Sequence, residues 1–138
     1  MKKLIYIAFS LFASLMVSSC ILEEVEPEYD IVGAVGTIAN LTANTTTPTV
    51  GQTVTFTVTF YSEHENATSL RMNRLNGTTA TNLSTIDFNS WNKEDSRVET
   101  FQYEIPEGTT PGALVIQFEL ITSSGFSTTR NITLTVQS

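Results

Sequence analysis

The chain has 138 residues, with 14 acidic side chains against 7 basic ones, one cysteine and one histidine. This acidity argues against a nucleic-acid partner, because binding to phosphates requires clustered lysine and arginine side chains. It also argues against attraction to anionic lipid head groups and favours a soluble, monomeric domain. A single cysteine forms no disulfide within the chain, so the fold must depend on an apolar core.

The first residues have the pattern of a secretory signal peptide. Residues 1–3, MKK, have two positive charges, and residues 4–17 have no charge and are apolar apart from two serines. Ser18 and Ser19 are small and come directly before Cys20. Exported proteins begin with this order of positive charge, short apolar core and small residues at the cleavage site. The apolar core is shorter than the roughly 20 residues of a transmembrane helix.

The sequence VSSC, which ends at Cys20, resembles the bacterial lipobox of an aliphatic residue, two small residues and an invariant cysteine. The resemblance implies that residues 1–19 are a lipoprotein signal peptide and that Cys20 becomes the first mature residue. In that family the sulfur receives diacylglycerol and the new amino group is usually acylated. More than one chain is needed for stable anchoring, since each buried methylene contributes about 0.8 kcal/mol. The alternatives are a buried structural cysteine and a reactive thiol, although an unpaired thiol is unusual in an exported protein.

Residues 20–32 are predicted to form an acidic tether between the lipid and the domain. The segment contains Pro27 and few apolar side chains, a composition typical of extended linkers, and it spans at most about 40 Å. Acidic residues soon after a lipidated cysteine resemble the surface-export signals of Bacteroidota lipoproteins. We therefore expect a lipid anchor in the outer membrane, with the periplasmic and the cell-surface sides both left open. The acidic residues are Glu23, Glu24, Glu26, Glu28 and Asp30.

Residues 33–138 are predicted to form one domain, and their clearest element is a strand at 52–61, QTVTFTVTFY. Apolar residues alternate with threonines in this stretch, and successive side chains of a strand point to opposite faces. One face is therefore expected to be buried, and the other to be a threonine face exposed to water. Similar alternation predicts strands at 99–106, 113–122 and 130–138, and weaker patterns predict strands at 37–43 and 68–75.

Six or seven short strands separated by polar turns indicate an all-β protein with an antiparallel β-sandwich. The order of elements resembles a bacterial immunoglobulin-like (Ig-like) or PKD-like domain. The resemblance lies in PTVGQTVTFTVTF at 48–60 and IPEGTTPGALVIQFELITSSGFSTTRNITLTV at 105–136. It implies about seven strands but little about function, because unrelated activities occur on this fold. With the lipobox, the chain also resembles small Bacteroidota lipoproteins and the N-terminal Ig-like domain of starch-utilisation lipoproteins.

The loop at 86–95, IDFNSWNKED, contains the candidate ligand-binding residues Trp91, Asn89 and Phe88. Glycan sites often combine an aromatic platform with amide groups that form hydrogen bonds. The alternative is that Trp91 caps the sandwich core or stiffens an edge strand, while the Asn and Asp residues turn the chain.

No pattern in the sequence indicates catalysis, a metal or a cofactor. His64 is the only histidine, whereas a zinc site needs several His or Cys ligands. No G-x-S-x-G sequence marks a nucleophile. Glu63 and Glu65 flank His64, and calcium prefers oxygen ligands, but no D-x-D-x-D-G loop is present. A cation between the acidic loops stays an open alternative.

These patterns together predict a lipid-anchored protein of the cell envelope that is not an enzyme and uses no cofactor. Its expected partners are the membrane, through Cys20, and an envelope protein assembly on which the single Ig-like domain docks. The alternative is a glycan-binding surface lipoprotein or adhesin that uses the loop around Trp91.

Overall fold

The structure, a computed structural model, describes residues 34–138, which contain strands and turns but no helix. Cys20, the predicted signal peptide 1–19 and the predicted tether 20–32 lie outside the described residues. Within the described part, no helix is long and apolar enough to cross a membrane. The seven strands are β1 Thr37–Ala43, β2 Thr53–Tyr61, β3 Ala67–Asn76, β4 Thr79–Asp87, β5 Arg97–Glu104, β6 Gly112–Thr122 and β7 Ser127–Val136.

Apolar residues and threonines alternate along β2, and, as predicted, the apolar side chains are buried while the threonines face outward. Its four apolar side chains, Val54, Phe56, Val58 and Phe60, are fully buried. The threonines between them are half-buried on the outer face of the strand. β6 repeats the pattern, because every second residue from Leu114 to Leu120 faces the core. Burial on one side of each strand therefore fixes the inner face of each sheet.

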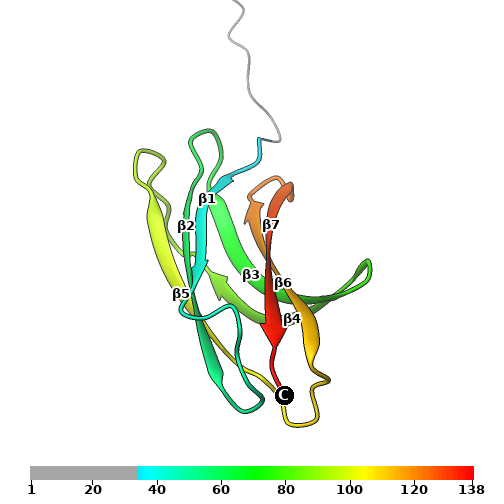
Figure 1. The fold of residues 1–138 in the computed structure, drawn as a ribbon. Coiled ribbons are helices and arrows are strands. Elements are labelled where there is room, and N and C mark those ends of the chain that lie inside the picture. Colours follow the sequence, from blue (N-terminus) through cyan, green and yellow to red (C-terminus); the bar gives the residue numbers. More distant parts are fainter. Residues whose placement is uncertain (1–33) are drawn as a thin grey trace, which may run out of the picture. The chain divides into compact units, whose positions relative to one another are not determined.

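The strands form two antiparallel sheets, one with the order β1-β2-β5 and one with the order β4-β3-β6-β7 (Figure 1). In the constant-type immunoglobulin order, the fourth strand joins the sheet of the first, second and fifth strands. Here the fourth strand pairs with β3 instead. The predicted all-β, antiparallel Ig-like β-sandwich of about seven strands is confirmed.

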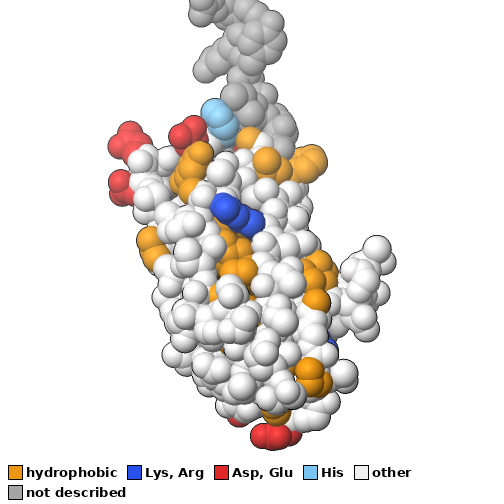
Figure 2. Space-filling model, in the orientation of Figure 1, with side chains coloured by type: hydrophobic (Ala, Val, Ile, Leu, Met, Phe, Trp, Pro, Cys, Tyr) orange, Lys and Arg blue, Asp and Glu red, His pale blue; other side chains and the backbone are white. Residues whose placement is uncertain are grey.

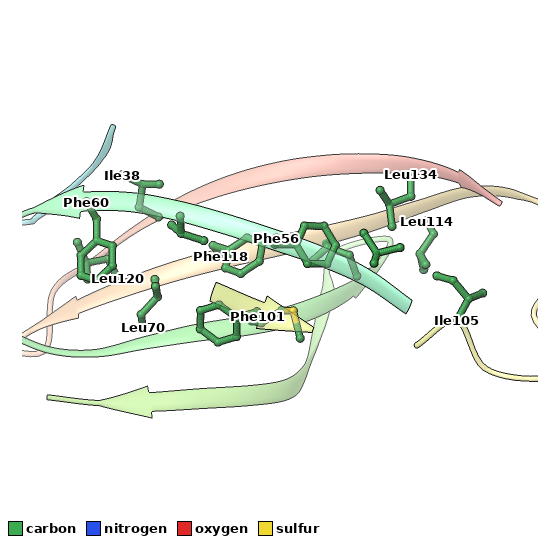
Figure 3. Packing of buried hydrophobic residues seen from close by; sticks show 14 of the residues in the cluster. Ile38, Phe56, Phe60, Leu70, Phe101, Ile105, Leu114, Phe118, Leu120 and Leu134 are labelled. Carbon is green, nitrogen blue, oxygen red and sulfur yellow. The ribbon is translucent and has the colours of Figure 1, made fainter. Parts of the chain in front are cut away.

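Aromatic rings fill the centre of the space between the sheets (Figure 3). Phe118 of β6 makes edge-to-face contacts with Phe56 of β2 and Phe101 of β5, with ring centroids 5.4 and 5.3 Å apart. Such pairs contribute about 0.5–1.5 kcal/mol beyond the burial of their area. Because Phe118 comes from one sheet and its two partners from the other, these contacts join the two sheets.

β4, with the sequence TATNLSTID, is a strand that the sequence does not predict. Its first four side chains are exposed, so it lacks the apolar alternation of a half-buried strand. Its register with β3 shifts at Leu83, which is the extra residue of a β-bulge. The predicted loop at 86–95 is wrong at its start, because Ile86 and Asp87 belong to β4.

The segment between β1 and β2 covers part of the outer edge of β7. The backbone N–H groups of Thr135 and Gln137 donate to the carbonyl oxygens of Thr46 and Pro48, both at 2.8 Å. Arg130 of β7 donates to two carbonyl oxygens of β1. β1 and β7 thus connect the two sheets on one side of the sandwich. β5 and β4 are the edge strands of the two sheets on the opposite side.

Candidate binding surfaces

Two loops are joined at the end of the sandwich near which the described chain begins (Figure 1). The indole Nε1 of Trp91 donates to the carbonyl oxygen of Ser62 at 3.0 Å. The Nζ of Lys93 donates to the carbonyl oxygen of His64 at 2.9 Å. Figure 2 shows the histidine and several acidic side chains exposed at this end. The loop after β4 is therefore fixed to the loop after β2.

The rings of Trp91 and Phe88 pack on the core. Both lie against the fully buried Phe60, with ring centroids 5.9 and 5.5 Å away, and they are 5.5 Å from each other. The guanidinium carbon of Arg97 lies 4.5 Å from the centroid of the Phe88 ring, in a cation–π arrangement. These contacts match the alternative in which Trp91 caps the core of the sandwich.

Trp91 also lines a shallow hollow with a volume of about 230 Å³. Asn89 is exposed and does not line this hollow. The structure thus brings Trp91 and Phe88 together and leaves Asn89 apart. A ligand-binding role for these three residues stays a prediction. The other lining residues are Ser90, Asn92, Asp95, Ser96 and Arg97.

The acidic residues around His64 are candidate oxygen ligands for a cation. Within residues 34–138, no group of three or more His, Cys, Asp or Glu side chains is arranged to hold a metal ion. The Glu65 carboxylate accepts a hydrogen bond from the backbone N–H of Ser124 at 3.3 Å. It therefore helps to join the loop after β6 to the loop after β2.

The outer face of the β1-β2-β5 sheet is almost free of charged side chains. Thr57 of β2 pairs with Thr42 of β1 on one side and with Thr100 of β5 on the other. Directly opposite residues of antiparallel strands share a face, so threonines meet across all three strands. We call this surface the threonine face; it comprises Asn40, Thr42, Thr53, Thr55, Thr57, Thr59, Val98, Thr100, Gln102 and Glu104.

The outer face of the β4-β3-β6-β7 sheet is different, because it contains charges and amides. Arg71 lies 3.9 Å from the carboxylate of Glu119, and Asn82 Nδ2 donates to Asn73 Oδ1 at 3.0 Å. These four residues line a hollow of about 460 Å³ together with Ala80 and Thr85. The sequence does not predict this hollow, because its residues come from three strands that are not predicted to adjoin.

Comparison with solved structures shows the same fold in unrelated sequences. A Niemann-Pick type C2 protein from Japanese carpenter ant is 8% identical with a TM-score of 0.58, and the match covers 78% of this chain and 97% of that one. The sporulation control protein Spo0M from Bacillus subtilis is 11% identical with a TM-score of 0.54, covering 76% of this chain and 50% of that one. No protein-family model and no curated protein matches the sequence. At these identities the likeness shows the β-sandwich fold alone.

Proposed function

We propose that this protein is a lipid-anchored accessory protein of the cell envelope, and that its Ig-like domain docks on an envelope protein through the threonine face. The supporting observation is that only Glu104 of this face is charged, in a chain with a net charge of −7. Charged residues are depleted from the centres of protein interfaces, since removing an unpaired carboxylate from water is costly. A partner protein can therefore cover this face without removing many charged side chains from water.

β5 gives the threonine face a free edge. An edge strand presents unpaired backbone N–H and C=O groups, to which an extended segment of another chain can pair. Within the described residues β5 pairs with β2 alone, and its register is regular from Arg97 to Glu104. Arg97 and Glu99 form an ion pair at 2.9 Å. Charged side chains on the first half of this edge disfavour pairing with another strand there. The open part is thus Thr100–Glu104.

The proposed lipid anchor is supported by the sequence around Cys20. The described chain begins at Ala34, whose carbonyl oxygen accepts a hydrogen bond from Thr122 Oγ1 at 3.0 Å. A tether from Cys20 would therefore reach the domain at the loop end. The threonine face lies along the outer side of β1, β2 and β5. Resemblance to Bacteroidota lipoproteins supports the outer membrane, on either of its two sides.

The proposal is tested by recovering the tagged protein from its native membrane in mild detergent and identifying co-purifying proteins by mass spectrometry. Thr100→Lys places a charge on the open part of β5, and we expect it to abolish recovery of a stoichiometric partner. Thr133→Lys is the matched control, because Thr133 is an exposed threonine on β7 in the opposite sheet. Equal recovery by both variants, or the absence of any stoichiometric partner, would overturn docking through this face.

The hollow beside Trp91 supports a second function, glycan binding by a surface lipoprotein or adhesin. It combines an indole with the amide of Asn92, the carboxylate of Asp95 and the guanidinium of Arg97. Aromatic and hydrogen-bonding groups in one hollow are suited to a sugar ring. Affinity electrophoresis in polysaccharide gels should then show less retention for Asn92→Ala than for Asn131→Ala, whose exposed residue lies on β7. Equal retention of the two variants would exclude this site.

A further inference from the structure

A cleft opens between the two sheets on the side of the sandwich formed by β4 and β5. It has a volume of about 450 Å³, which is within the usual range for small-molecule sites. Figure 1 shows the tip of the β3–β4 hairpin projecting away from the sandwich, and Arg74, Asn76 and Thr81 of this hairpin are exposed. We call this space the inter-sheet cleft; it is lined by Arg74, Asn76, Thr81, Leu83, Tyr103 and Pro106.

Arg74 lies on the core-facing side of β3. It pairs with Ile116 of β6, which is fully buried, and with Thr81 of β4. Residues directly opposite in an antiparallel ladder point to the same face, so the Arg74 side chain leaves the strand on the inner side of the sheet, although the residue is exposed to solvent. Among the described residues, Arg74 forms no ion pair and no side-chain hydrogen bond. The cleft therefore contains a cation without a protein partner.

The rest of the cleft is mainly apolar. Leu83 is the extra residue of the β4 bulge and is half-buried against the core. Tyr103 is half-buried on the inner side of β5, two residues from the fully buried Ile105. Pro106 follows Ile105 in the chain and adds a third apolar surface. No carboxylate lines the cleft, although the chain has 14 acidic residues.

An unpaired cation beside apolar surfaces fits a ligand of a particular chemistry. An arginine guanidinium binds a carboxylate through two parallel hydrogen bonds. Leu83 and Tyr103 would contact an apolar body attached to that carboxylate, and Asn76 and Thr81 offer further hydrogen bonds. We propose that the inter-sheet cleft is a binding site for a small amphipathic carboxylate, with Arg74 as its anion-binding residue. Tyr103 is on the inner side of β5, whereas the threonine face is on its outer side, so ligand binding in the cleft does not depend on docking at that face.

The test is isothermal titration calorimetry on the purified full-length protein in lipid nanodiscs, with empty nanodiscs as the blank. Two soluble probes, 4-phenylbutyrate and hexanoate, distinguish an aromatic from an aliphatic ligand. Their neutral amides measure the contribution of the charge. We expect at least one of the acids to bind, and to bind more tightly than its amide.

Arg74→Gln should weaken binding of the acid by about tenfold or more, the effect of losing hydrogen bonds to a charged group. Arg71→Gln is the matched control, because Arg71 is on the same strand but faces outward, toward Glu119. Leu83→Ser tests the apolar part and should weaken acid and amide alike. If neither acid binds, or if Arg74→Gln binds the acid as tightly as Arg71→Gln, the proposal is wrong. Unchanged thermal unfolding of Arg74→Gln would show that any loss of binding is local.

Discussion

The indole Nε1 of Trp91 lies 3.0 Å from the carbonyl oxygen of Ser62 and donates a hydrogen bond to it. Ser62 is buried directly after β2, and the indole ring lies against Phe60, the last buried residue of that strand. The loop after β4 is therefore fixed to the end of β2 by one hydrogen bond and one ring contact. Any ligand that binds at the hollow would meet a tryptophan whose position is already set by the fold.

Trp91→Phe keeps a ring on Phe60 but removes the donor. We expect it to lower the free energy of unfolding by about 1 kcal/mol, the usual net contribution of one hydrogen bond. Trp91→Ala also removes the ring contacts. Replacing a fully buried tryptophan by alanine lowers the free energy of unfolding by about 3–5 kcal/mol. Because Trp91 is only half-buried, we expect Trp91→Ala to lower it by roughly 2–3 kcal/mol. Urea denaturation followed by circular dichroism would measure both changes.

Asn89→Ala is the matched control in the same loop. Its side chain is exposed and forms no hydrogen bond within the described part of the chain. We expect a change within about 0.5 kcal/mol, as for most surface substitutions. If Trp91→Ala were as stable as Asn89→Ala, the indole would contribute nothing to the fold and would be available as a ligand platform.

The sequence predicts the fold well where one face of a strand is buried. In β2 the alternation of threonine with Val54, Phe56, Val58 and Phe60 identifies both the strand and its inner face. β4 has no such signal, because it is an edge strand with few buried side chains and a bulge at Leu83. Its pairing with β3 depends on the two-residue turn at Gly77, where φ is 61°. The Asn76-Gly77 pair is the feature of the sequence that favours a turn at this point.

The candidate sites are less predictable than the fold. Trp91 stands out in the sequence as the only tryptophan, whereas its packing on Phe60 depends on a strand pairing far from it in the chain. Arg74 has no distinguishing neighbours in the sequence. It becomes notable only because its register opposite Ile116 places a charged side chain on the core-facing side of β3. Register between strands decides such placements, and a single-residue shift would reverse them.

Arg130 provides a second test of how the sheets are joined. Its Nη1 donates to the carbonyl oxygens of Ile38 at 3.1 Å and Ala39 at 2.7 Å. The register of β1 shifts at this point, and a bulge leaves backbone groups without a ladder partner. Arg130→Met keeps much of the apolar stem but leaves these carbonyl groups unpaired. We expect a loss of roughly 1–3 kcal/mol and faster hydrogen exchange of the β1 amides.

Arg71→Met is the control for that experiment. Arg71 is exposed and its ion pair with Glu119 spans 3.9 Å, so its removal is expected to cost at most about 1 kcal/mol. Hydrogen exchange in β1 should not change in this variant. Equal exchange rates in the two variants would mean that Arg130 does not hold β1 in place.

Gly36 is placed where no side chain fits. A Cβ atom there would lie 2.5 Å from Cδ2 of Leu120 and 3.1 Å from the carbonyl oxygen of Tyr61. Gly36→Ala should therefore force the start of β1 away from β6 and lower the free energy of unfolding by about 1–3 kcal/mol, as overpacking does. Thermal unfolding would measure the change. Val35→Ala is the neighbouring control, because Val35 is 51% exposed, and it should unfold at the wild-type temperature. A stable Gly36→Ala variant would show that Leu120 moves aside without cost.

Cys20→Ser tests the lipid anchor on which the proposed location depends. Cys20 is the only cysteine, so no other thiol can accept the diacylglycerol group. The hydroxyl of serine does not replace the thiol in this modification, so we expect no incorporation of an alkyne-labelled fatty acid. Each buried methylene of an acyl chain contributes about 0.8 kcal/mol to membrane binding. Because the variant has no acyl chains, it should also leave the membrane fraction. Ser19→Ala keeps a small residue before the cysteine and should be labelled like the wild type. Labelling of Cys20→Ser, or its retention in the membrane fraction, would show that the chain is held there by something other than a lipid on Cys20.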